Sequence, residues 1–203
     1  SAAEVKELYL SKGLVGYWKM DADQKNSTST FDSSGYYNHG LITGAALTGE
    51  GKFKEGYKFD GNDYITSAPI FTNLTNFTLS AWINPKETGG DVSGYSAIIS
   101  KSSSSTNRYF WLMYDFNSNV VVLMMGNTTV GGICWTDSSA NVLANVWSHI
   151  VGVYNTTGCY VYVNGVLIGT DTTVSGLIES PTGLTSNVVV GYETGNRYFN
   201  GTI

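Results

Sequence analysis

The stretch Asn76–Pro85, NFTLSAWINP, alternates strictly between two kinds of side chain. Every second residue from Phe77 to Ile83 is apolar, and the residues between them are polar except Trp82. This period of two is typical of a β-strand with one face on a core. Pro85 ends the strand because proline has no N–H to donate to a sheet ladder. Since Trp82 lies on the polar side, either another segment covers it or a partner contacts it.

Composition supports an all-β domain. The chain has 203 residues, which fits one sandwich. Its 24 glycines, three prolines and many Ser, Thr, Asn and Tyr residues indicate short strands and frequent turns. A net charge of −5 argues against binding to nucleic acid or to an anionic membrane. The longest stretch without Asp, Glu, Lys or Arg, residues 138–170, is interrupted by polar residues throughout, so no membrane span is expected.

Two parts of the chain differ in pattern. Residues 1–12 combine apolar residues at helical spacing with a high charge density, which predicts a short helix or a docking arm. Residues 13–203 read as about a dozen short strands, beginning with 14–20. Segments 108–116 and 120–125 are predicted to form a hairpin whose strands are apolar on both faces, so both should lie centrally. Together these features predict two antiparallel sheets packed as a jelly-roll sandwich.

Several motifs in residues 13–203 resemble, in order and spacing, the LamG-like jelly rolls of the concanavalin A-like lectin/glucanase superfamily. The resemblance implies the same sandwich fold and an extracellular setting. Members of that family continue past their last glycine-rich strand with an acidic residue and more strand, so an open strand edge is expected near Ile203. The motifs are GLVGYWKMD (13–21), DSSGYYNHG (32–40), FDGNDYI (59–65), NFTLSAWINP (76–85), WSHIVGVY (147–154), YVNG (162–165) and FNGTI (199–203).

The resemblance also implies a structural calcium ion near the DSSG loop. By position, Asp32 is the best candidate ligand, helped by Asp21, Asn38 and nearby carbonyls. Carboxylate, amide and carbonyl oxygens are the ligands that calcium prefers. The alternative interpretation is that Asp32 closes an ordinary Asx turn.

The sequence contains neither a pair of catalytic carboxylates nor a nucleophile motif. Glycosidases of this superfamily place two carboxylates together on one strand face, and no two Glu residues of this chain share a strand. His39 lies in the DSSG loop and His149 on an otherwise apolar strand face, and no G-x-S-x-G motif accompanies them. We therefore predict that the protein is not an enzyme.

Aromatic and arginine residues in or beside loops are candidates for contacts with a sugar. A flat ring beside planar hydrogen-bond donors is a common arrangement in ligand sites. The alternative is that residues of these frequent types serve the core or its rim. The candidates are Tyr36, Tyr37, Arg108, Trp135 and Arg197.

Sequons and cysteines point weakly to the cell exterior. Cys134 and Cys159 form a disulfide if the protein is extracellular, and otherwise are two buried thiols. The number of N-x-S/T sequons is modestly above the roughly four that chance gives in so Asn-, Ser- and Thr-rich a chain. The candidate glycosylation sites are Asn26, Asn73, Asn76, Asn127, Asn155 and Asn200.

Two functions follow as hypotheses. The first is a non-catalytic recognition module, extracellular or on the cell surface, that binds a glycan or another surface ligand in adhesion. The second is a structural subunit of an extracellular filament or surface assembly, whose copies self-assemble by strand addition through their termini. The positions of the terminal segments, 1–12 and 198–203, discriminate between them.

Overall fold

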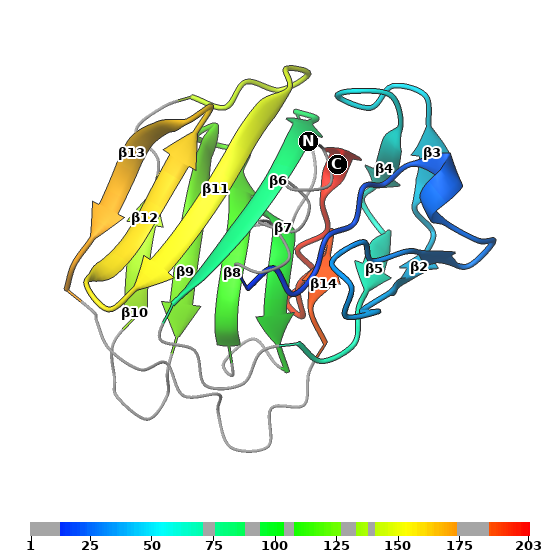
Figure 1. Cartoon of the computed structure of the whole chain (residues 1–203). Helices are drawn as coiled ribbons and strands as arrows, with labels where there is room; N and C mark the ends of the chain where they lie inside the picture. Colours follow the sequence, from blue (N-terminus) through cyan, green and yellow to red (C-terminus); the bar gives the residue numbers. More distant parts are fainter. Residues whose placement is uncertain are drawn as a thin grey trace, which may run out of the picture.

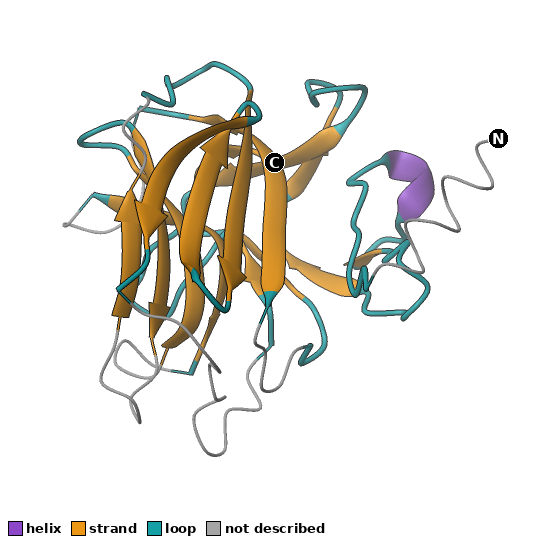
Figure 2. Cartoon of the chain, turned by 60° about the vertical axis from the view of Figure 1, so that its left-hand side comes forward, coloured by secondary structure: helices purple, strands orange, loops and turns teal. Residues whose placement is uncertain are grey.

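The chain folds as a sandwich of two antiparallel sheets, confirming the predicted all-β jelly-roll fold (Figure 1). The computed structural model describes residues 13–70, 76–87, 94–103, 108–126, 133–137, 141–173 and 187–203, with backbone alone for Arg108 and 133–137. The predicted arm, 1–12, lies outside the described residues. One short 3₁₀ helix, η1 (Ala22–Gln24), precedes the strands (Figure 2). In the described part of the chain, no helix is long and apolar enough to cross a membrane.

The two sheets differ in size. In spatial order, the eight-stranded sheet contains β1 (Ser29–Thr30), β2 (Gly40–Thr43), β5 (Tyr64–Thr66), β14 (Val189–Val190), β7 (Tyr95–Ser102), β8 (Arg108–Asp115), β9 (Val120–Gly126) and β10 (Ile133–Asp137). The spatial order of the seven-stranded sheet is β13 (Val166–Asp171), β12 (Gly158–Val163), β11 (Ser148–Asn155), β6 (Phe77–Pro85), β15 (Asn200–Thr202), β4 (Gly56–Asp60) and β3 (Ala46–Thr48).

Strand β6 has the alternation that its sequence predicts. Phe77, Leu79 and Ile83 are buried in the core between the sheets. Thr78 and Ser80, between them in sequence, are exposed on the outer face. β6 pairs with β11 over seven residues, so the outer face of the seven-stranded sheet is built around these two strands.

Strands β8 and β9 are interior strands near one end of the eight-stranded sheet, and they are buried on both faces, as their apolar sequences predict. Phe110 and Leu112 point into the main core, whereas Trp111 belongs to a second, smaller apolar cluster. The smaller cluster lies on the outer face of the eight-stranded sheet, because neighbouring residues of a strand point to opposite faces. Arg197 covers part of this smaller cluster, because its guanidinium lies 5.1 Å from the Trp111 ring centroid.

Residues 14–20 do not form the predicted strand. Trp18 makes one isolated bridge to Asp32, and Met20 has a φ of 62°, which ends extended structure. The Trp18 indole instead donates to the Asn38 carbonyl at 2.9 Å. This segment therefore supports the loop that follows β1.

The last strand, β15, lies inside its own sheet. It pairs with β4 on one side and with Asn84 and Pro85 of β6 on the other. Beyond it, Ile203 and Tyr57 exchange backbone hydrogen bonds of 3.0 and 2.9 Å. Residues 200–203 thus pack within their own sandwich, whereas the other terminal segment, 1–12, is outside the described residues, so the choice between the two hypotheses stays open.

Candidate functional site

An aromatic and polar cluster lies on the outer face of the seven-stranded sheet, where the pleat of β6 aims Ser80, Trp82 and Asn84. His149 of β11 is directly opposite Trp82 in the register, so the two side chains share this face. The turn between β3 and β4 adds Lys52 and Phe53 to the cluster. We call this set the Trp82 surface.

Trp82 is the centre of these contacts. The His149 ring stacks on it at 5.1 Å between centroids and 30° between planes. Phe53 meets it edge-on at 5.7 Å and 84°, and the Lys52 ammonium lies 4.4 Å from the ring centroid. Trp82 is therefore covered by another segment of the chain, one of the two outcomes that its position on the polar face predicted.

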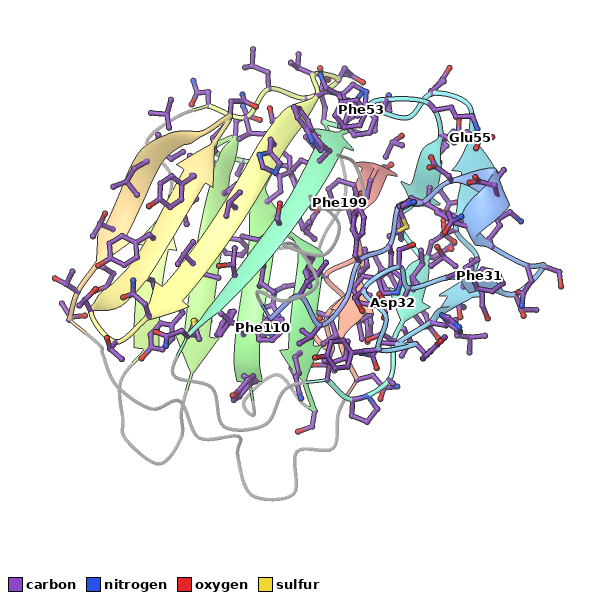
Figure 3. The ribbon with its side chains drawn as sticks, in the orientation of Figure 1. Phe31, Asp32, Phe53, Glu55, Phe110 and Phe199 are labelled. Atoms are coloured by element: carbon purple, nitrogen blue, oxygen red, sulfur yellow. The ribbon has the colours of Figure 1, made fainter. Side chains whose placement is uncertain are left out.

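Phe53 is the exposed part of the Trp82 surface, with 84% of its area accessible to solvent. Figure 3 shows Phe53 near the upper end of the seven-stranded sheet, whereas Phe110 and Phe199 lie inside the sandwich. Folding gains little from an apolar ring left in water, since burial stabilises by roughly 25 cal/mol per Å². A flat exposed ring on a fixed aromatic base is suited to contact with another molecule.

Polar groups surround the rings. Ser80 Oγ and His149 Nε2 share a hydrogen bond of 2.8 Å. Asn164 Oδ1 accepts the His149 backbone N–H at 2.9 Å, which holds the start of β11 in place. The Asn84 side-chain oxygen is buried and has no hydrogen-bond partner among the described residues. Because this oxygen is shielded from solvent, a ligand on the outer face does not contact it in this conformation.

The DSSG loop has its own centre in Asp32, which is 8% exposed. Its Oδ1 accepts the backbone N–H groups of Tyr17 and Ser34, both at 2.8 Å. Its Oδ2 accepts Ser34 Oγ at 2.6 Å and the Asn38 N–H at 3.0 Å. Burial alone raises the pKa of this carboxyl, but the hydrogen bonds from Ser34, Tyr17 and Asn38 offset it, and the pKa lies below its usual value.

These bonds fit a calcium site poorly. Both Asp32 oxygens already accept protein donors, and the Asn38 amide nitrogen donates to the Val15 carbonyl at 2.7 Å. Asp21 is the N-cap residue of η1. The described residues contain no group of three or more His, Cys, Asp or Glu side chains placed to hold a metal. Calcium at this loop stays a prediction, and the geometry favours the alternative, an Asx turn.

The predicted sugar-contacting residues do not gather at one place. Tyr36 and Tyr37 are 61% and 80% exposed and stand on the loop that Asp32 closes. The side chain of Arg197 is 17% exposed, and its Nη1 donates to Glu193 Oε2 at 2.6 Å. This pair lies by β7, and strands β5 and β14 separate β7 from β2 in the sheet order. The side chains of Arg108 and Trp135 are outside the described part of the chain.

The sequons stay predictions, but the structure places several of them. Asn26 is exposed in the turn before β1, Asn76 is exposed just before β6, and Asn155 ends β11. Asn200 lies in β15 between two paired strands. Asn73 and Asn127 lie outside the described residues. Cys159 is disulfide-bonded, and the chain has one other cysteine, Cys134 in β10, whose side chain is not described.

Comparison with known proteins identifies the class. A laminin G-type family model described as the Concanavalin A-like lectin/glucanases superfamily matches residues 59–203. Since this is well over half of the chain, the protein belongs to that superfamily. Among curated proteins, none matches the sequence significantly.

Solved structures share the fold at low sequence identity. Domain 4 of AbnA, a GH43 extracellular arabinanase from Geobacillus stearothermophilus in complex with arabinotriose, is 17% identical with a TM-score of 0.60, over 84% of this chain and 82% of that one. Trypanosoma rangeli sialidase with the inhibitor DANA is 18% identical with a TM-score of 0.62, over 94% of this chain but 29% of the sialidase. A heptameric SAP-like pentraxin from Limulus polyphemus is 16% identical with a TM-score of 0.52, over 71% and 70%.

Sequence reasoning singled out Trp82 but not its neighbours. Lys52 and Phe53 belong to a segment that the sequence predicts only as turns, and His149 reads as a core residue. The usable signal was Trp82 itself, because a tryptophan on a polar face needs contacts from elsewhere.

Proposed function

We propose that this chain is a non-catalytic, extracellular or cell-surface module that binds glycans through the Trp82 surface. The observation that carries the proposal is the Phe53 ring, 84% exposed and held edge-on against Trp82. Sugar rings present apolar C–H faces that pack on aromatic rings, and their hydroxyls form hydrogen bonds with exposed polar groups such as Ser80 Oγ. The fold is compatible with this use, since domain 4 of AbnA shares it and was solved with arabinotriose. Glycan binding is also an adhesive function when the glycan lies on a cell surface.

The test is binding of the protein to an array of neutral and acidic oligosaccharides, followed by calorimetry on the best ligand. The variant Phe53→Ala is expected to lose about tenfold in affinity, since an aromatic contact contributes roughly 1.5 kcal/mol. Tyr37→Ala is the matched control, because Tyr37 is equally exposed at a different loop. If the protein binds no oligosaccharide on the array, the proposed function is wrong. If Tyr37→Ala loses binding and Phe53→Ala does not, the site lies on the DSSG loop.

A second candidate function, assembly by strand addition, is favoured by the edge of β6. Lys86 N–H donates to the Asn200 carbonyl at 2.9 Å, so Lys86 points its backbone groups towards β15. By the two-residue repeat of a strand, Trp82, Ser80 and Thr78 point theirs to the same side. β15 pairs only with Asn84 and Pro85 in its strand register, and no other described strand lies along this edge. An extended segment of another copy is a fitting occupant.

Light scattering after size exclusion, with electron microscopy of any large species, tests this second candidate. Ser80→Pro removes an N–H from the open edge, whereas the bonds of β6 to β11 come from the alternate residues. If copies assemble through this edge, wild-type protein forms polymers and Ser80→Pro is monomeric. A monomeric wild-type protein at all concentrations contradicts strand addition and leaves the glycan proposal intact.

A further inference from the structure

We propose that the Trp82 surface selects acidic glycans, whose carboxylate or sulfate group is bound by lysines around the aromatic cluster. The inference deepens the proposed function and rests on it. Its basis is the charge of the surface, because a chain of net charge −5 repels anions unless cations are grouped locally. Three lysines, Lys52, Lys58 and Lys86, are exposed around this cluster.

The sheet register fixes where these lysines stand. Lys58 points to the outer face because its neighbours in β4, Tyr57 and Phe59, are buried in the core. It lies in one row with Thr202 and Asn84 across three adjacent strands. Strands are about 4.8 Å apart, so its Cα is roughly 10 Å from that of Asn84. A monosaccharide or disaccharide spans this distance.

The other two lysines flank the same row. Lys52 holds its ammonium 4.4 Å from the Trp82 ring centroid. Lys86 continues the outward-facing side of β6 after Asn84, and its Nζ donates to Asn145 Oδ1 at 2.8 Å. Because Asn145 is a neutral partner, the positive charge of Lys86 is not neutralised by this bond. Each of these ammonium groups has N–H donors available to bind an anionic oxygen.

Among the described residues, four acidic side chains lie near the surface, each of them outside the row from Lys58 to Asn84. Glu55 is turned to the N-terminal segment, where Oε2 accepts the Ala22 N–H at 2.8 Å, and it pairs with Lys54 at 3.8 Å. Asp60 faces outwards at the far end of β4, opposite Asn200. Glu50 and Glu87 are exposed beside the same turn and strand end. These acidic residues lie around the row, whereas the row itself, from Lys58 to Asn84, contains no acidic side chain.

The ligand that fits has three features. Its sugar ring packs on Phe53, a hydroxyl forms a hydrogen bond with the exposed Ser80 Oγ, and its anionic group lies between Lys52 and Lys58. Uronic acids, other carboxylated sugars and sulfated sugars share this chemistry. A neutral sugar of the same shape makes the first two contacts and lacks the third.

The experiment compares matched oligosaccharides that differ only in charge: a neutral hexose oligomer, its uronic acid counterpart and its sulfated counterpart. The wild-type protein is expected to bind an acidic member about 1.4-fold to 5-fold more tightly per ion pair, which is the range that 0.2–1 kcal/mol per exposed pair gives. The preference should shrink as NaCl is raised, because salt screens exposed charges. Comparing the uronic acid and sulfate members shows which anion the surface takes.

Variants distinguish the preference for acidic glycans from the glycan-binding function on which it rests. Lys52→Gln with Lys58→Gln should bring the ratio of acidic to neutral oligosaccharide affinity close to one, which is a ratio that a general loss of binding does not change. Lys19→Gln is the control, since Lys19 is an exposed lysine outside the Trp82 surface. Equal binding of neutral and acidic oligomers by wild type overturns the acidic preference alone. Failure of every oligomer to bind contradicts the glycan function itself.

Discussion

Replacing Asp32 tests whether its carboxylate organises the DSSG loop through hydrogen bonds. In Asp32→Asn, the amide oxygen still accepts the backbone N–H groups of Tyr17 and Ser34. The new NH₂ group, however, faces the Asn38 N–H, and two donors cannot form a hydrogen bond with each other. One backbone donor loses its partner and the remaining bonds lose their charge assistance. At about 1 kcal/mol for each of these losses, we expect a destabilisation of about 2 kcal/mol. Asp32→Ala orphans three backbone N–H groups, and about 3–4 kcal/mol is expected.

Urea unfolding followed by tryptophan fluorescence measures these losses. With a slope of about 2–3 kcal/mol per M for a chain of this size, Asp32→Asn should move the midpoint down by roughly 0.7–1 M. Asp23→Asn is the control, because Asp23 is exposed in η1 and its replacement should change stability by less than about 0.5 kcal/mol. A midpoint for Asp32→Asn equal to that of wild type would refute the reasoning.

The same variant gives a signature in pH and in calcium. Because the folded-state pKa of Asp32 lies below its unfolded value, its contribution is complete above about pH 5 and is lost as pH falls through the folded pKa. Asp32→Asn should lack this part of the acid destabilisation. Calcium or EDTA should leave the wild-type midpoint unchanged. A calcium-dependent stabilisation that Asp32→Asn abolishes would instead show that the predicted metal site exists.

Three further predictions concern the body of the sandwich. Gly201→Ala should destabilise by about 2–4 kcal/mol, because φ is +146° and a Cβ would lie 2.4 Å from the Asn84 carbonyl oxygen; thermal unfolding checks this, and an unchanged Tm contradicts it. Burial lowers the pKa of Lys101 from 10.5 to about 8, so its contribution to the unfolding free energy should rise with pH between these values, and Lys101→Met should remove that contribution in urea titrations. Cys159→Ser should cost about 2–4 kcal/mol. Non-reducing peptide mapping should recover Cys159 linked to Cys134, and free thiols in unreduced protein would argue otherwise.

Local sequence patterns specify the class of fold and the faces of its clearest strands. The alternation in NFTLSAWINP determines which face of β6 packs on the core, because Phe77, Leu79 and Ile83 all lie on one face of a strand with a period of two. Asn164-Gly165 specifies the β12–β13 hairpin, since both residues adopt positive φ there, 50° and 82°. The family motifs likewise predicted the superfamily whose model matches residues 59–203. Each of these features depends on neighbours in sequence, so it can be predicted before the fold is known.

The membership of the candidate site, in contrast, follows from the assembled sheets. The tight turn after β4 leads into β5, yet the two strands belong to different sheets, a choice that no local pattern encodes. Phe53 and Lys52 reach Trp82 from a turn about 30 residues away, and His149 reaches it through the register with β11. Arg197, predicted to face a ligand, is held by Glu193 and Trp111. Side-chain partners across strands depend on sheet order and register, which are set by the packing of the whole core.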